Sequence, residues 1–233
     1  GRLPRNSMMS ISPDAGHAAL FEPDGQVNLW NLRADSHTAI PTARGEHVVD
    51  CLFTRNANYL VTFIQMPTNL VARIWDVRQA RPAGSFSIAQ ASVFAAPAIP
   101  NTLLVAGGDG LRLWRLDRPE EPPQLIPEDG DLAGFAAAPE RRLGAGAFTE
   151  GSVRLWDLDS LRLVDTLHGL LLGAHSVAFS NDGRRLAAGS NGQEAVKVWD
   201  IETRQEVLTL AGEGSLFEQV AFSPDGRHLL AIN

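Results

Sequence analysis

At residues 153–158 the chain reads Val153-Arg154-Leu155-Trp156-Asp157-Leu158, and a phrase of this form occurs five times. The other four copies contain Trp30, Trp75, Trp114 and Trp199, so every tryptophan of the chain belongs to the pattern. Successive tryptophans are 45, 39, 42 and 43 residues apart. A near-constant period of this length is typical of repeat architectures, in which each unit buries its apolar faces against its neighbours.

One repeat shows four predicted strands. Residues 176–180 alternate in polarity, and Asp182-Gly183 supplies a turn. Residues 185–190 form a second strand of small side chains, residues 195–201 carry the tryptophan, and residues 206–210 form the fourth strand. Short strands joined by turns predict an antiparallel meander. Both faces of the third strand are apolar, which predicts that both are covered.

Along nearly its whole length the chain resembles the WD-repeat β-propeller family. The resemblance rests on the five tryptophan phrases and on turn phrases at residues 12–14, 180–183 and 223–226. It implies an all-β fold, a β-propeller of four-stranded antiparallel blades in an incomplete ring. We expect a single domain over residues 1–233, with blades at 8–41, 47–88, 92–127, 132–168 and 175–210 and a two-stranded half blade at 218–232. We expect the rest of the full-length chain to supply the missing blades, and the end blades to expose Val220, Phe222 or their neighbours.

The chain departs from the family pattern at two kinds of position. The family often has Gly-His before the first strand, where Gly169-Leu170 and Gly212-Glu213 stand here. The family network of His, Asp, Ser or Thr and Trp is therefore expected to be missing from these two units. Trp30 and Trp114 are followed by Asn31 and Arg115 instead of aspartate.

Composition argues against several classes of protein. The net charge of −7 argues against a general nucleic-acid binder, which needs a basic surface. No apolar run approaches the roughly 20 residues of a membrane helix, so we expect no membrane partner. The first six residues lack the apolar segment of a secretory signal, which favours a cytoplasmic location. Basic residues are arginine except for Lys197, and alanine, glycine and proline are frequent, a composition that suggests a bacterial genome.

The sequence offers no residues for catalysis, for a metal or for a cofactor, and we predict none of these. Cys51 is the only cysteine and lies in an apolar stretch, so we expect it in the core. No histidine pairs with another at metal-ligand spacing. The chain has no serine in a Gly-x-Ser-x-Gly context, and nothing in it assembles a nucleophile, a base and an oxyanion donor.

Charge supplies one candidate site. In the family arrangement, loops between fourth and first strands and between second and third strands share one end of the propeller, the top. Acidic residues dominate these loops, which predicts an acidic face for a basic partner. Its members are Glu46, Asp109, Glu128, Asp129, Asp131, Glu150, Glu194 and Glu213. The alternative interpretation is that these are scattered, solvated turn charges.

Two further patterns accompany the acidic loops. The tract 170–172 is three leucines in a top loop, either a buried connection or an exposed apolar anchor. Arg73, Arg112, Arg154 and Lys197 each stand two residues before a tryptophan. We expect their stems to pack on the tryptophan face and their charges to reach a neighbouring carboxylate.

The resemblance implies a non-catalytic protein-interaction scaffold, and the charge pattern adds a basic peptide or protein segment as its partner. Three alternatives stay open. The chain is a regulatory or sensory array attached to a catalytic domain outside it, such as a bacterial kinase or ATPase, or it is a propeller enzyme with catalytic groups on its loops. The third alternative is a purely structural spacer.

Overall fold

The computed structural model describes residues 8–21, 26–41, 46–88, 93–95, 99–107, 110–191, 196–212 and 217–232. These residues form strands and one short 3-10 helix, η1 (Pro139–Arg141), with no α-helix among them. They fall into two compact units. Unit 1 comprises residues 1–91, 100–104 and 113–124, and unit 2 comprises 92–99, 105–112 and 125–233.

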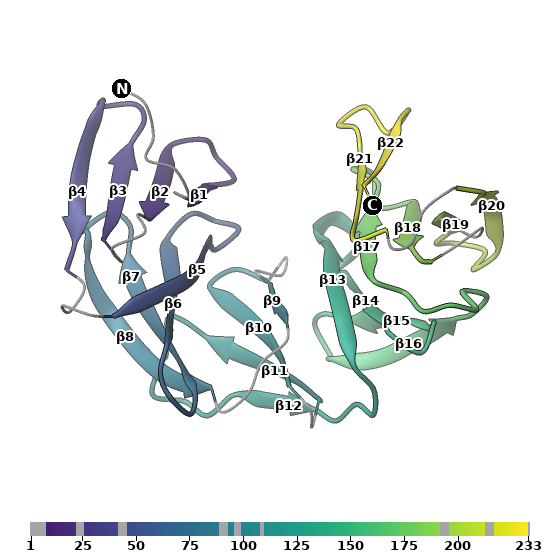
Figure 1. The fold of residues 1–233 in the computed structure, drawn as a ribbon, viewed down its shortest axis with the longest axis horizontal. Helices are drawn as coiled ribbons and strands as arrows, with labels where there is room; N and C mark the ends of the chain where they lie inside the picture. Colours follow the sequence, from purple (N-terminus) through teal and green to yellow (C-terminus); the bar gives the residue numbers. More distant parts are fainter. Residues whose placement is uncertain are drawn as a thin grey trace. The chain divides into compact units, whose positions relative to one another are not determined.

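Two complete meanders lie in unit 1 (Figure 1). The first contains β1 (Met8–Ile11), β2 (His17–Phe21), β3 (Val27–Asn31) and β4 (Ser36–Ile40). The second contains β5 (His47–Phe53), β6 (Tyr59–Gln65), β7 (Leu70–Asp76) and β8 (Arg81–Ile88). In both sheets each strand pairs antiparallel with the next strand along the chain.

A third four-stranded sheet has residues in both units. It contains β9 (Val93–Ala95), β10 (Thr102–Gly107), β11 (Gly110–Arg115) and β12 (Gln124–Ile126), again in sequential order. The order of its strands is therefore the same as in the sheets that lie within one unit.

Unit 2 holds two more four-stranded meanders and one hairpin. The first meander contains β13 (Leu132–Ala138), β14 (Leu143–Phe148), β15 (Val153–Asp157) and β16 (Arg162–Leu167). The second contains β17 (Ser176–Phe179), β18 (Arg185–Gly189), β19 (Val196–Asp200) and β20 (Glu206–Leu210). The hairpin pairs β21 (Gln219–Phe222) with β22 (Leu229–Ile232). Five four-stranded sheets and one two-stranded sheet confirm the predicted fold class.

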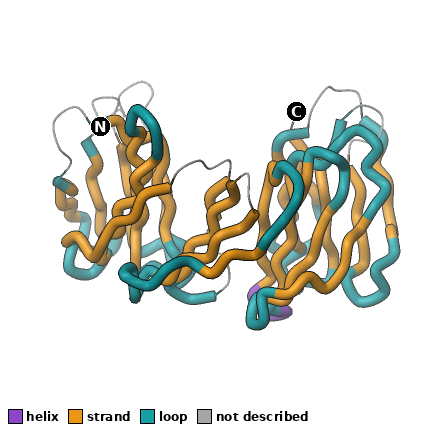
Figure 2. The backbone as a smooth tube through the Cα atoms, turned by 90° about the horizontal axis from the view of Figure 1, so that it is seen from below, coloured by secondary structure: helices purple, strands orange, loops and turns teal. Residues whose placement is uncertain are grey.

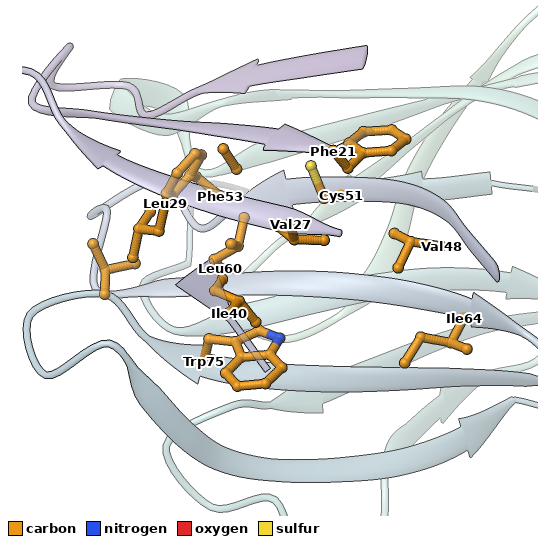
Figure 3. Packing of buried hydrophobic residues seen from close by; sticks show 12 residues of the cluster. Phe21, Val27, Leu29, Ile40, Val48, Cys51, Phe53, Leu60, Ile64 and Trp75 are labelled. Carbon is orange, nitrogen blue, oxygen red and sulfur yellow. The ribbon is translucent and has the colours of Figure 1, made fainter. Parts of the chain in front are cut away.

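Apolar side chains on both faces of a sheet hold neighbouring sheets together within each unit. In unit 1, Trp75, Phe53, Leu29 and Phe21 belong to one buried cluster between the first two sheets (Figure 3). In unit 2, alternate residues of β19 face opposite ways. Trp199 packs in the cluster shared with β14 and β15, whereas Val196 and Val198 pack with β21 and β22. A sheet covered on both faces is what the tryptophan phrases predict.

The tryptophans occupy the same place in successive sheets. Trp75, Trp114, Trp156 and Trp199 are between 1% and 6% exposed. Trp30 is only partly buried, and its ring stacks on His37 with centroids 4.5 Å apart. The small residues of the second strand make room for the indoles. A Cβ added at Gly146 would lie 2.9 Å from the Trp156 ring, closer than real Cβ atoms approach.

Apolar residues are also exposed in the first and last sheets. In the hairpin, Val220 is buried because it packs with Val198, so the expectation that it is exposed is wrong at this residue. Its neighbours Leu230 and Ile232 are exposed. The number of sheets is consistent with the predicted incomplete ring.

Candidate functional site

The predicted acidic face is partly described by the structure. Asp109, Glu194 and Glu213 lie outside the described residues. Glu46 precedes β5 in unit 1. Glu128, Asp129 and Asp131 lie between β12 and β13, and Glu150 lies in the turn between β14 and β15, all in unit 2. In the part of Figure 2 that holds the C-terminus, the described loops and turns lie at both ends of the strands.

Glu46 pairs with Arg73 of β7, the third strand of the sheet that follows it. Its two carboxylate oxygens accept hydrogen bonds from both terminal nitrogens of Arg73, at 2.8 and 3.0 Å. Both side chains are largely shielded, with 18% of Glu46 and 25% of Arg73 exposed. The Arg73 guanidinium lies 5.9 Å from the Trp75 ring, and the Trp75 indole donates to Thr62 Oγ1 at 3.0 Å. A bidentate, partly buried pair of this kind fixes the loop before β5.

Glu128 has the equivalent role in unit 2. Its Oε1 accepts a hydrogen bond from the buried Trp156 indole nitrogen at 3.0 Å, and its Oε2 pairs with Arg154 Nη1. Only 9% of the Glu128 side chain is exposed. The Arg154 guanidinium also lies 4.2 Å from the centre of the Phe148 ring. Glu128 therefore joins the segment before β13 to the third strand of the sheet.

Arg154 also contacts Asp129 and Glu150. Its Nη2 donates to the Asp129 carbonyl oxygen at 3.0 Å and to Glu150 Oε1 at 3.1 Å, while Asp129 Oδ1 lies 3.5 Å from Nη1. Partial burial by itself lowers the pKa of the guanidinium, but the hydrogen bond to Glu128 and the nearby carboxylate charges outweigh burial and raise it. Three carboxylates surround this one cation.

These groups line an open depression of about 880 Å³ in unit 2. Asp129 is fully exposed and Glu150 is 46% exposed, so both present carboxylate oxygens to solvent. Asp131, two residues after Asp129, is exposed but is not part of the lining, and its carbonyl accepts a hydrogen bond from the Thr149 nitrogen at 3.0 Å. The rest of the lining includes Leu163, Thr166, His168 and Leu171. The structure thus brings Glu128, Asp129 and Glu150 together.

The basic side chains two residues before Trp75, Trp156 and Trp199 reach carboxylates, as predicted. Arg73 and Arg154 pair with glutamates, and Lys197 Nζ lies 2.9 Å from Glu206 Oε2. The sequence interpretation missed that Glu46 and Glu128 are the partners of two of these cations. One signal was present in the sequence, because each glutamate precedes its arginine by almost the same distance, 27 and 26 residues.

The aspartates after the tryptophans have a structural role. Asp157 Oδ1 accepts hydrogen bonds from the backbone nitrogens of Ser160 and Asp159, at 2.7 and 3.1 Å. These bonds, with the Ser160 nitrogen first, lower the pKa of Asp157. Asn31 Oδ1 accepts two turn N–H groups at 3.0 Å in the same way. The substitution at Asn31 therefore keeps the turn bonds, whereas Arg115 instead pairs with Asp117.

The part of the chain that the structure describes contains no group of three or more His, Cys, Asp or Glu side chains placed to hold a metal. None of its helices is long and apolar enough to cross a membrane. Cys51 is buried, and burial raises the pKa of its thiol to about 12, which makes it a core residue and not a nucleophile.

Part of the chain matches a known family. Residues 163–200 match the model described as WD domain, G-beta repeat. The match begins within β16 and ends with β19, so one sequence repeat combines the fourth strand of one sheet with the first three strands of the next. Comparison with curated proteins gave no match.

Proposed function

We propose that the chain is a WD-repeat β-propeller protein that acts as a non-catalytic scaffold and binds a basic peptide or protein segment on its acidic loops. The WD repeat supports a protein-interaction role in general. The depression in unit 2 supports the finer proposal. Its single cation, Arg154, is already surrounded by Glu128, Asp129 and Glu150, so the depression keeps an excess of negative charge.

The arrangement divides the acidic residues by role. The largely shielded Glu128 side chain holds the loop, whereas Asp129, Asp131 and Glu150 are exposed and remain available to a partner. Arg154 fixes the backbone of Asp129, so a ligand does not have to order that loop on binding. Lysine or arginine side chains of the partner would form charge-assisted hydrogen bonds with the exposed carboxylates.

Glu46 is one of the four other predicted acidic residues. It pairs with Arg73, as Glu128 pairs with Arg154, and we propose the same bracing role for it. Asp109, Glu194 and Glu213 remain predicted members of the acidic face.

Charge reversal tests this proposal. The Asp129→Lys/Asp131→Lys variant of the full chain is expected to slow association with a Lys- and Arg-containing peptide by roughly tenfold and to change dissociation less, because exposed charges act mainly on the encounter. Raising the salt concentration is expected to weaken binding to the unaltered protein, since the Debye length is about 10 Å at 0.1 M. Surface plasmon resonance measures both rates.

A matched control has the same change in net charge. Glu140→Lys/Glu202→Lys reverses two exposed carboxylates of unit 2 that lie outside the segment between β12 and β13, one in η1 and one in the turn after β19. This variant is expected to bind with rates close to those of the unaltered protein. If salt and the Asp129/Asp131 reversal both leave binding unchanged while circular dichroism shows intact folding, the proposal is wrong.

A further inference from the structure

The loop between β16 and β17 presents two leucines to solvent. Leu171 is 81% exposed and Leu172 is 58% exposed, whereas the adjacent Leu170 is only 3% exposed. The leucine tract therefore combines both predicted behaviours, a buried connection at one residue and an exposed apolar pair at the next two. Large apolar side chains exposed next to each other are typical of interaction sites.

The backbone of this loop is held firmly. Leu170 and Ala174 belong to the buried cluster between the two meanders of unit 2. The Ala174 nitrogen donates to the Phe148 carbonyl at 3.0 Å, and Asn191 Nδ2 donates to the Leu172 carbonyl at 3.0 Å. Leu171 and Leu172 thus lie between two anchored residues.

The turn before β15 packs closely on the same loop. A Cβ added at Gly151, where φ is +98°, would lie 1.9 Å from the Leu170 carbonyl oxygen. Glu150, the neighbour of Gly151, carries one of the exposed carboxylates. The loop with the leucines and the turn with the acidic group are therefore fixed against each other, which lowers the entropy lost when a ligand contacts both.

Apolar and acidic groups meet in the depression. Leu171 and the 51% exposed Leu163 line it together with Asp129 and Glu150. A ligand that fills it contacts carboxylates and leucines at once. An anionic lipid surface does not fit, because the same carboxylates would repel it. A second copy of the chain does not fit for the same reason, because it would bring its own exposed carboxylates to this site.

We infer that Leu171, which lines this depression, is its apolar anchor together with Leu172 beside it in the same turn, and that the depression therefore selects a cationic segment carrying a large apolar side chain next to its lysine or arginine. The inference rests on the proposed function and adds the determinant of specificity. The carboxylates attract the segment and affect association, whereas burial of its apolar side chain against the leucines slows dissociation.

Two peptides of equal charge test this inference with the full chain. One alternates arginine with leucine, and the other alternates arginine with serine. The leucine peptide is expected to bind about tenfold more tightly, which corresponds to about 1.4 kcal/mol. In Leu171→Ser/Leu172→Ser this advantage is expected to disappear while the affinity for the serine peptide stays the same. Leu32→Ser, which alters a 48% exposed leucine of unit 1, is the control and should keep the advantage.

The outcomes separate the two proposals. Equal binding of both peptides, still weakened by salt and by Asp129→Lys/Asp131→Lys, would overturn the inference and leave the proposed function standing. Salt-independent binding that the reversal does not change would refute the proposed function itself. Sedimentation of the protein alone and flotation with anionic vesicles test the other occupants. A dimer, or vesicle binding, that Leu171→Ser/Leu172→Ser abolishes would also overturn the inference.

Discussion

Glu128→Ala is expected to lower the free energy of unfolding of unit 2 by about 2–4 kcal/mol. The substitution leaves the Trp156 indole nitrogen, which lies in a residue only 1% exposed, without its acceptor. A buried donor without a partner costs about 1–3 kcal/mol, and loss of a charged hydrogen bond adds about 1.5–3 kcal/mol. The second contribution is reduced because Arg154 keeps Glu150 and the Asp129 carbonyl as partners.

Glu128→Gln separates these contributions. The amide oxygen of glutamine can still accept the hydrogen bond of the indole, so only the charge that faces Arg154 is lost. We expect this variant to cost about 1 kcal/mol, in the range of a partly shielded ion pair. Trp156→Phe removes the indole donor instead. In that background Glu128→Ala should cost less than it does in the unaltered chain, because no donor is left without an acceptor.

Urea denaturation followed by far-UV circular dichroism measures these differences, provided that the slope of each transition stays constant. Two outcomes would refute the reasoning. One is an equal cost for Glu128→Ala and Glu128→Gln. The other is an unchanged cost of Glu128→Ala when Trp156 is phenylalanine. Either result would mean that Glu128 does not brace the indole, and its carboxylate would then return to the acidic residues available to a partner.

Burial raises the pKa of the Cys51 thiol to about 12, so we expect it to react with a thiol reagent at pH 8 only as unit 1 unfolds. Labelling at the rate of a free thiol in native buffer would contradict its burial. Turn N–H groups hold the pKa of Asp157 and of Asp200 below 3.8, so these groups add stability above that pH and lose it as the pH falls through their folded-state pKa. The thermal unfolding midpoint should therefore fall as the pH is lowered, and it should fall less steeply with pH in the Asp157→Asn/Asp200→Asn variant. Equal slopes of midpoint against pH for the two proteins would exclude a contribution from these aspartates. Gly183 and Gly226 have φ of +66° and +68°. Gly226→Ala should cost about 1 kcal/mol through backbone strain, and Gly183→Ala more, because its Cβ would lie 2.7 Å from an arginine carbon; similar unfolding free energies for both would argue against that clash.

The fold was predictable because local and long-range signals coincide in each repeat. Every tryptophan phrase has apolar residues on both faces of a strand, and the structure buries both faces, as Trp199 and Val198 show. Turn residues such as Asp182-Gly183 separate the strands at the positions that the pattern predicts. These signals lie within a few residues of each other, so the sequence displays them directly.

The candidate site was only partly predictable, because its chemistry depends on pairs that are distant in the sequence. The acidic loops were interpreted as one class of residue, but the structure separates the braced Glu128 from the exposed Asp129 next to it. Their difference comes from Arg154, 26 residues further along the chain. Neither composition nor strand periodicity states which of two adjacent carboxylates turns inward. Only the packing of the loop on the third strand decides this.

Arg154 links the stability of unit 2 to its proposed recognition role. The same guanidinium binds the buried Glu128, the Asp129 carbonyl and the exposed Glu150, so it neutralises charge and orders the loops at once. An acidic surface without such a cation would attract a basic ligand more strongly, but its like charges would repel each other and its loops would have to be ordered on binding. The observed arrangement gives up part of the negative charge and gains a fixed geometry. We therefore expect selectivity at this depression to depend on the position of the remaining carboxylates relative to Leu171 more than on their number.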